Sequence, residues 1–443
     1  YSAMHCGIST DFNTGWQLGD IKGAFLSDTD ATDVTGTEYV TNGNFSTGDL
    51  TGWTQKINGS GSLSVNGSNQ AVIVSQNSSN QTELQQTVVV PKGVDLIYSL
   101  DVVSGSIYNG GAASSNIGAG TYQWTFNIPG TGTQTINLWF TPPGWSGTGT
   151  INNVSIRTAE QDRSVHGRVN SGSGNSIQRH GLQHHGTINK RRVAVGAQLV
   201  GYNFPAATSY FTQPYTPEIG DIGSDPFCVM GWFYNTPRGV TFFDIASAAS
   251  PRFFIAQMYN SDNFWFYMNT GSGGQSWQPI SGGGVENEAR WQFIAVKRVG
   301  TRLSYSYNGA DFVSQINGAW GGSLASNYPN PKVTLGQNYT HGSAHFGSNG
   351  MMSLWKFSTS VPTNEQIKKI YNDEKLLFQE NAKCSLYGTS DDVEALAYDD
   401  KTDVLHVGTS GGRSDFRGLK RINNTTTAVT TAISASNGFV AEQ

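Results

Sequence analysis

The stretch from residue 291 to residue 309 predicts two β-strands joined at Val299-Gly300-Thr301, and hydrophobic and polar residues alternate strictly in the second strand. Leu303, Tyr305 and Tyr307 occupy every second position, with serines between them. A period of two is typical of a strand that buries one face. The Asn308-Gly309 pair that follows favours the positive φ angles of a tight hairpin turn.

The same alternation recurs in the first third of the chain and predicts a β-sandwich from Val40 to Arg157. Tyr122, Trp124 and Phe126, for example, alternate with polar residues. Short strands separated by turn residues are typical of antiparallel sandwiches. The strands that the pattern predicts are Ala71 to Val74, Leu84 to Val90, Leu96 to Val102, Thr121 to Ile128 and Thr135 to Phe140.

The period changes from two to 3.6 at Thr363, which predicts one substantial helix over residues 363–378. Thr363 and Gln366 have the spacing of a capping box. Ile367 and Ile370 begin an apolar stripe at helical spacing. Short strands are predicted again after the helix, at Val393 to Tyr398, Val404 to Thr409 and Gly418 to Ile422.

The composition agrees with several folded domains made of strands and turns. The 443 residues include 54 glycines, and only 13% of the residues are charged while 12% are aromatic. The formal net charge of −5 gives no general attraction to nucleic acid or to anionic membranes. No apolar run is long enough to span a bilayer. We therefore expect neither a nucleic-acid partner nor membrane insertion.

Three widely separated cysteines, Cys6, Cys228 and Cys384, do not form a disulfide framework. Buried thiols in a protein assembled in a reducing cytosol are the simplest interpretation. The chain begins with Tyr1 and shows no signal peptide. We therefore expect a processed chain or a part of a longer polypeptide.

The stretch 291–309 resembles the central hairpin of laminin-G-like, concanavalin-type jelly rolls. In that pattern a Trp-x-x-Ile-Ala-Val strand precedes a turn and a strand of roughly Leu-x-x-Tyr-x-Asn-Gly. This chain has Trp291 and residues 294–296 in the first strand, and Leu303 and residues 307–309 in the second. The resemblance implies a jelly roll over residues 193–381, with the helix packed against it. Residues 225–234 resemble its early strand, and residues 332–336 and 350–357 resemble its closing strands.

Residues 41–53, which end in Gly52-Trp53, resemble the opening of jelly-roll carbohydrate-binding modules. The resemblance implies such a module over residues 37–158. That family often holds a structural calcium ion at aspartates where this chain has Asn152 and Asn153. Amides lack the charge that a calcium site needs, so we expect no metal and no other cofactor.

Both ends of the chain resemble parts of β-propellers. Residues 9–16 are similar to the Asp-box hairpin, and the strands after residue 382 resemble most of a blade. The resemblance implies propeller-like segments at 1–36 and 382–443, which we expect to form one unit with the sandwiches inserted. The fold class expected is therefore all-β, with two antiparallel jelly-roll sandwiches, propeller-like segments at both ends and one helix after the second sandwich.

Residues 159–192 are predicted to be a solvated basic linker, because glycine, serine and asparagine surround six Lys or Arg residues there. His180, His184 and His185 lie in this range without the carboxylate or cysteine partners of a zinc site. The aspartates at positions 28, 30 and 33 lack the glycine and distal glutamate of a calcium loop. We expect both groups to be solvated.

Several segments are similar to tail-fibre and tail-associated virion proteins of marine tailed bacteriophages. They are residues 13–22, 26–30, 210–215, 371–375 and 404–410. The resemblance implies a structural and adhesive virion protein that acts outside the cell. It also implies other virion proteins as partners and a homo-oligomer, most commonly a trimer.

No catalytic motif is present in the sequence. Concanavalin-type glucanases place their two catalytic carboxylates on one strand, whereas Glu286 and Glu288 fall in a glycine-rich loop. Motifs for metalloproteases, phosphate binding and serine hydrolases are also missing. We therefore expect a binding protein and no enzyme. A secreted bacterial polysaccharide-degrading enzyme with accessory modules and a purely architectural virion component are the alternatives.

Aromatic side chains in glycine-rich loops are the best candidates for a binding site. Aromatic rings pack against the C–H faces of sugars, while amides and acids bind the hydroxyl groups. Most of the 11 Trp and 18 Tyr residues are expected in the cores. The candidates for contact with a host-surface glycan are Trp145, Trp277, Trp320, Tyr108 and Tyr339.

Overall fold

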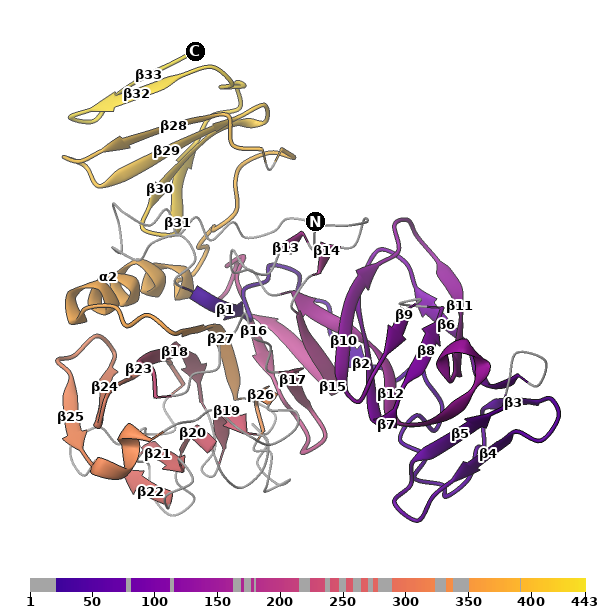
Figure 1. Ribbon diagram of the computed structural model, residues 1–443. Helices are drawn as coiled ribbons and strands as arrows, with labels where there is room; N and C mark the ends of the chain where they lie inside the picture. The colour runs from indigo at the N-terminus through magenta and orange to yellow at the C-terminus, as the bar shows by residue number, and fades with distance from the viewer. Residues whose placement is uncertain are drawn as a thin grey trace.

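The computed structural model consists almost entirely of antiparallel β-strands, with one α-helix among the described residues (Figure 1). This confirms the predicted all-β class. No described helix is long and apolar enough to cross a membrane. The structure describes residues 21–76, 81–111, 115–161, 169–170, 177–178, 181–214, 224–235, 240–246, 252–257, 264–269, 274–277, 289–322, 332–337, 350–390 and 392–443.

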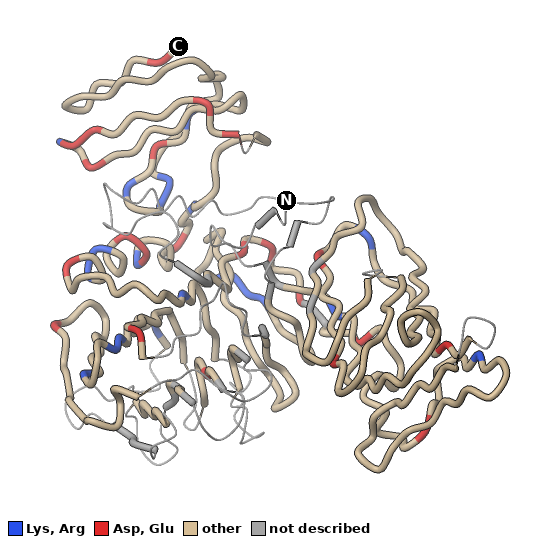
Figure 2. The backbone as a smooth tube through the Cα atoms, in the orientation of Figure 1, with Lys and Arg blue, Asp and Glu red and all other residues tan. Residues whose placement is uncertain are grey.

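The first sandwich consists of two five-stranded arrays, and charged residues are sparse along its strands (Figure 2). One sheet has the order β3 (Thr54–Ile57), β6 (Thr82–Pro91), β11 (Thr133–Thr141), β8 (Ile107–Gly110) and β9 (Ser115–Ile117). The facing array has the order β4 (Ser62–Val65), β5 (Ala71–Ser75), β12 (Gly147–Gln161), β7 (Asp95–Gly105) and β10 (Gly120–Asn127). Leu84, Tyr98 and Phe140 are among the buried residues between them.

The second sandwich encloses the largest hydrophobic core, which includes Phe211, Phe243 and Trp355. One face consists of β1 (Ile21–Phe25), β16 (Val200–Asn203), β27 (Met351–Ser358), β18 (Phe227–Tyr234), β23 (Trp291–Val299), β24 (Arg302–Tyr307) and β25 (Val313–Ile316). The other face consists of β15 (Gly181–Arg192), β17 (Tyr210–Pro214), β26 (Lys332–Leu335), β19 (Thr241–Ala246), β20 (Arg252–Gln257), β21 (Phe264–Asn269) and β22 (Gly274–Trp277).

The predicted hairpin and the predicted helix are both confirmed in the second sandwich. Strands β23 and β24 pair as a hairpin whose turn lies between Val299 and Arg302. The next turn, after β24, has Asn308 and Gly309 at φ angles of +50° and +72°. Helix α2 (Asn364–Glu374) continues as η4 (Lys375–Phe378), and the Thr363 capping box is present. The helix packs its apolar stripe on the outer face of β18 and β23, where Trp232 belongs to the same buried cluster.

Residues 181–192 are not part of a solvated linker, which corrects the prediction for 159–192. Strand β15 pairs with β12, β16, β17 and β2 (Val34–Gly36). Because β12 also belongs to the first sandwich, the sandwiches are joined by paired strands (Figure 1). The short pair β13 (Val169–Asn170) and β14 (Ile177–Gln178) also lies within residues 159–192.

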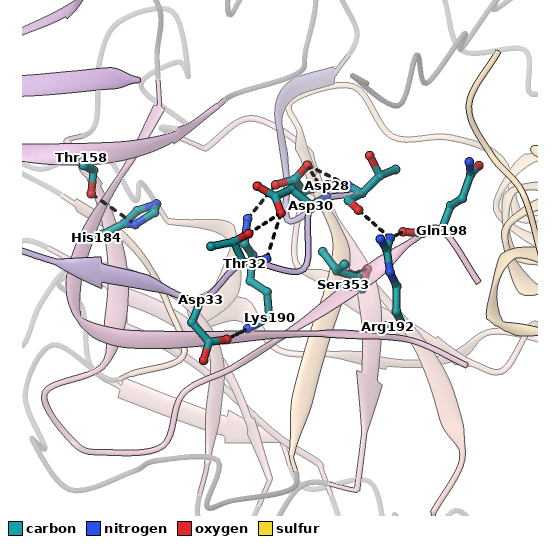
Figure 3. A network of polar contacts seen from close by, with 12 residues as sticks. Asp28, Asp30, Thr32, Asp33, Thr158, His184, Lys190, Arg192, Gln198 and Ser353 are labelled. Atoms are coloured by element: carbon teal, nitrogen blue, oxygen red, sulfur yellow. Dashed lines mark hydrogen bonds and ion pairs between the residues drawn. The ribbon is translucent and has the colours of Figure 1, made fainter. Parts of the chain in front are cut away.

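Lys190 of β15 is buried and paired with Asp28, contrary to the predicted solvation of both, whereas Asp30 and Asp33 are exposed (Figure 3). The Nζ of Lys190 lies 2.7 Å from a carboxylate oxygen of Asp28, and its backbone N–H donates to Asp33 over 2.8 Å. Asp30 accepts from the backbone and the hydroxyl of Thr32. These contacts fix the segment between β1 and β2 on β15.

The N-terminal segment does not form a propeller blade over residues 21–36, which corrects that part of the prediction. Strand β1 pairs with β27 and β2 pairs with β15, so both extend the sheets of the second sandwich. The Asp-box-like residues 9–16 lie outside the described residues. The C-terminal segment is a four-stranded meander of β28 (Ala395–Asp399), β29 (Val404–Thr409), β30 (Gly412–Arg417) and β31 (Lys420–Asn424), with a hairpin of β32 (Ile433–Ser436) and β33 (Phe439–Glu442).

His184 of β15 is buried at the junction of the sandwiches, contrary to its predicted solvated position. Its ring contacts Phe211 edge-on, with 4.8 Å between centroids. Burial, together with the nearby Lys190 charge, lowers the pKa of His184 from 6.5 to about 3. The imidazole is therefore neutral in the folded protein at any pH above about 3.

We expect this burial to make the fold sensitive to mild acid. Below pH 6.5 the unfolded chain binds a proton at His184 that the folded chain does not, so stability falls as the pH falls from 6.5 toward 3. Between pH 7 and pH 5 the free energy of unfolding should drop by about 2 kcal/mol more in the parent than in His184→Gln. Urea denaturation at both pH values measures this difference, and equal drops would contradict the assignment.

Candidate functional site

The sequence candidates Trp145 and Tyr108 come together on the outer face of the first sandwich. Trp145 lies in the turn η1 (Pro143–Trp145), which follows β11, and Tyr108 lies on β8. Between them lies Trp139 of β11, whose alternation with the buried Leu138 and Phe140 points its ring outward. We call Trp145, Trp139 and Tyr108 the Trp145 cluster.

The three rings of the Trp145 cluster form a continuous aromatic surface. The rings of Trp139 and Trp145 are nearly parallel, with an interplanar angle of 9° and 6.1 Å between centroids. Tyr108 also packs against Trp139, with 4.9 Å between ring centroids and an interplanar angle of 43°. All three rings are half-buried, so each keeps an exposed part. Parallel and tilted ring pairs at such spacings are favourable contacts in their own right.

Trp145 is held in a backbone conformation that bulky residues rarely adopt. Its φ angle is +60°, in the left-handed region that is unfavourable for residues other than glycine, asparagine and aspartate. The buried Ser75 donates its hydroxyl to the carbonyl oxygen of Trp145 over 2.9 Å, and the Trp145 N–H donates to Pro142 over 3.1 Å. Strained conformations that surrounding contacts maintain are concentrated at functional sites.

Gly110 makes room for the ring of Trp139. Strands β11 and β8 place the two residues directly opposite each other. A Cβ atom built on Gly110 would lie 2.0 Å from Cε2 of Trp139, far inside any contact distance. The ring can therefore lie flat across the neighbouring strand only because residue 110 has no side chain.

A pocket of about 500 Å³ lies beside the Trp145 cluster. Tyr108 is directly opposite Asn116 in the β8–β9 pair, and Asn116 lines the pocket. Ser146 and Gly147, which follow Trp145, line it too. The lining residues are Ser106, Asn116, Ile117, Gly118, Pro142, Pro143, Ser146, Gly147 and Thr148. Neutral hydroxyl and amide groups that can donate and accept hydrogen bonds thus adjoin an aromatic surface.

A polar row borders the Trp145 cluster on the same sheet face. Gln85 of β6 is directly opposite Trp139, and Glu83 lies two residues before it on the same side. The Glu83 carboxylate accepts from Lys56 of β3 over 3.0 Å and also from the side chain of Gln85. Across the part of the chain that the structure describes, no three His, Cys, Asp or Glu side chains form a group that could hold a metal ion.

Of the other three sequence candidates, the two that the structure describes do not join this site. Trp320 is fully buried in the second core, so its prediction as a surface platform is wrong. It lies in η3 (Gly318–Gly321), where Asn317 caps the turn and the ring enters the core. Trp277 ends β22, opposite Phe266 in the second sandwich. Tyr339 lies outside the described residues.

Trp139 is the member of the cluster that sequence reasoning missed. The alternation in residues 135–140 already separates Leu138 and Phe140 from Trp139. A tryptophan on the polar side of a strand was therefore the available signal. Which side of the sheet lies open to solvent depends on pairing with distant strands, and that information is not local.

No protein-family model matches the chain, and no curated protein matches it in sequence. Among solved structures, the chain is similar to the receptor-binding domain of botulinum neurotoxin C/D mosaic serotype, with 9% identity and a TM-score of 0.34 over 56% of this chain. The match spans 60% of the length of that neurotoxin chain.

A second similar structure is the CBM40 module of the Ruminococcus gnavus IT-sialidase bound to α2,3-sialyllactose. It shows 11% identity and a TM-score of 0.31, and the match covers 39% of this chain and 95% of that module. The identities and TM-scores are too low for either likeness to carry a functional argument. Function is therefore argued from the geometry of the Trp145 cluster.

Proposed function

We propose that the first sandwich is a non-catalytic glycan-binding module and that the Trp145 cluster is its platform. The observation that supports this most strongly is the half-buried Trp145 ring, held at a φ of +60° against Trp139 and beside a pocket of about 500 Å³. A strained turn that presents an aromatic ring to solvent does little for packing, but it suits the C–H face of a sugar. The adjoining hydroxyl and amide groups suit sugar hydroxyls.

Replacement of Trp145 by alanine should weaken glycan binding by about 1–2 kcal/mol, or roughly 5- to 30-fold in Kd. The fold should persist because the ring is only half-buried. Val89→Ala is the matched control, since Val89 is 54% exposed on the same face of the same sheet. Glycan-array screening followed by calorimetry of both variants measures the effect. Unchanged affinity of Trp145→Ala would refute the platform, as would equal weakening in both variants.

Several sequence segments resemble tail proteins of marine bacteriophages. On that basis, the proposed role of the module is to attach a virion to its host, as part of a tail fibre or a tail-associated protein. Its ligand is then a glycan on the host surface, and the protein assembles as a homo-oligomer, most commonly a trimer. Labelled protein should adsorb to host cells, and Trp145→Ala should adsorb less. Release of reducing sugar ends from a bound polysaccharide by the purified chain would instead favour a polysaccharide-degrading enzyme.

A further inference from the structure

We propose that the Trp145 cluster and its pocket select neutral sugars and discriminate against acidic ones, an inference that rests on the proposed glycan-binding function. Every residue that lines the pocket is uncharged, and so are the three residues of the cluster. The polar groups of the lining belong to Ser106, Asn116, Ser146 and Thr148 and to the backbone. Such groups pair with sugar hydroxyls, whereas carboxylate, phosphate and sulfate groups are recognised chiefly by arginine and lysine.

The three basic residues of the first sandwich are placed elsewhere or bonded to acids. Lys56 is partly exposed, but its ammonium lies 3.0 Å from the Glu83 carboxylate and is paired with it. Arg157 lies 3.0 Å from Glu38 and donates to the carbonyl oxygen of Gly36 at the junction with the second sandwich. Both cations therefore already have anionic partners within the protein.

Lys92 is at the far end of the sheet from the pocket. Lys92 follows Pro91, which pairs with Thr133 at the start of β11. The pocket adjoins the opposite end of β11, beyond the pair of Phe140 and Leu84. Lys92 is eight positions after Leu84 along this extended segment, a span of about 26 Å. Such a distance exceeds the screening length in physiological salt, which is about 8 Å. Lys92 is thus too distant to receive an acidic sugar, and Lys56 and Arg157 already have acidic partners.

The surrounding charge also disfavours an anion. Residues 37–158 contain five acidic and three basic side chains, which gives a formal net charge of −2. Figure 2 shows how few charged positions lie along these strands. A carboxylated sugar would therefore lose hydration in the pocket without gaining a cationic partner.

Gly118 provides a position at which this selectivity can be changed without disturbing the fold. It lines the pocket, and a Cβ atom built on it would meet nothing within 4 Å. Its φ angle lies outside the left-handed region that would penalise a side chain. Gly118→Lys should therefore place an ammonium group at the pocket, and Gly118→Ala is the matched uncharged control.

The experiment measures the Kd of the full-length chain for two panels of probes by calorimetry. Cello-, manno-, malto- and chito-oligosaccharides are the neutral panel, and sialyllactose, oligogalacturonate and a sulfated galactan oligosaccharide are the acidic panel. We expect the parent to bind a neutral probe with a Kd that changes less than about 2-fold between 50 and 500 mM NaCl, because no ionic contact is screened. Gly118→Lys should gain at least about 5-fold affinity for acidic probes relative to Gly118→Ala.

The outcomes separate this inference from the proposed function. Preferential binding of an acidic probe by the parent, weakened by Trp145→Ala, would overturn neutral selectivity and leave the glycan platform intact. If the parent prefers a neutral probe and Trp145→Ala does not weaken that binding, both the glycan platform and its neutral selectivity are overturned for this site. Failure of the folded parent to bind any probe in either panel would also overturn both.

Discussion

Replacement of Glu374 by alanine should lower the free energy of unfolding by about 3–5 kcal/mol. Glu374 is 1% exposed at the end of helix α2 and forms an ion pair with the buried Lys356 of β27. It also accepts the indole N–H of Trp232 over 2.7 Å. Its removal leaves a buried ammonium and a buried indole N–H without the acceptor that holds the helix on the sheet.

Two further variants test whether the cost arises from the buried Lys356 charge that Glu374→Ala leaves unpaired. Lys369→Ala removes an ion pair on the same helix that is partly exposed, 3.4 Å from Asp373, and should cost less than about 1 kcal/mol. The double variant Lys356→Met with Glu374→Leu removes both buried charges and should recover most of the loss. Guanidinium denaturation measures all three. A Glu374→Ala cost below about 1 kcal/mol would show that the pair does not hold the helix.

Replacement of Trp320 by alanine should destabilise the protein by about 3–5 kcal/mol, the usual cost of deleting a large ring from a core. Trp320 is 0% exposed and belongs to the largest hydrophobic core. Trp145→Ala removes the same ring from the half-buried platform and should cost much less. Thermal unfolding of the two variants side by side distinguishes a core tryptophan from a platform tryptophan. Similar losses in both would contradict the distinction.

The elements with strong local signals were predictable from the sequence. The alternation in residues 303–307 specifies which residues share a face, and Asn308-Gly309 specifies the turn after that strand. The helix was equally clear because Thr363 and Gln366 satisfy each other at its start. These features depend on residues a few positions apart, so a single sequence contains the necessary information.

The junction was not predictable because its partners are distant in sequence. Lys190 is bonded to Asp28, a residue 162 positions earlier. Without that pairing, a run of basic residues among glycines and serines is typical of a solvated linker. The same limit explains His184, whose burial results from strands that the local pattern does not specify.

The sequence indicated which tryptophans lie in turns, but not which of them reach the surface. Glycines around Trp145 and Trp320 indicate turns in both cases, but a turn can present a ring to solvent or insert it into a core. The Asn317 cap directs Trp320 inward, whereas the φ of +60° and the Trp139 stack hold Trp145 at the surface. That choice is made by tertiary packing.

The most direct test of the central claim is a crystal structure of the full chain with the oligosaccharide that binds most tightly in the probe panels. We predict a sugar ring stacked on Trp145, with hydroxyl groups hydrogen-bonded to Asn116 or Ser146 in the pocket. A sugar bound on the second sandwich or the C-terminal sheet, with the Trp145 cluster empty at a saturating concentration, would contradict the account.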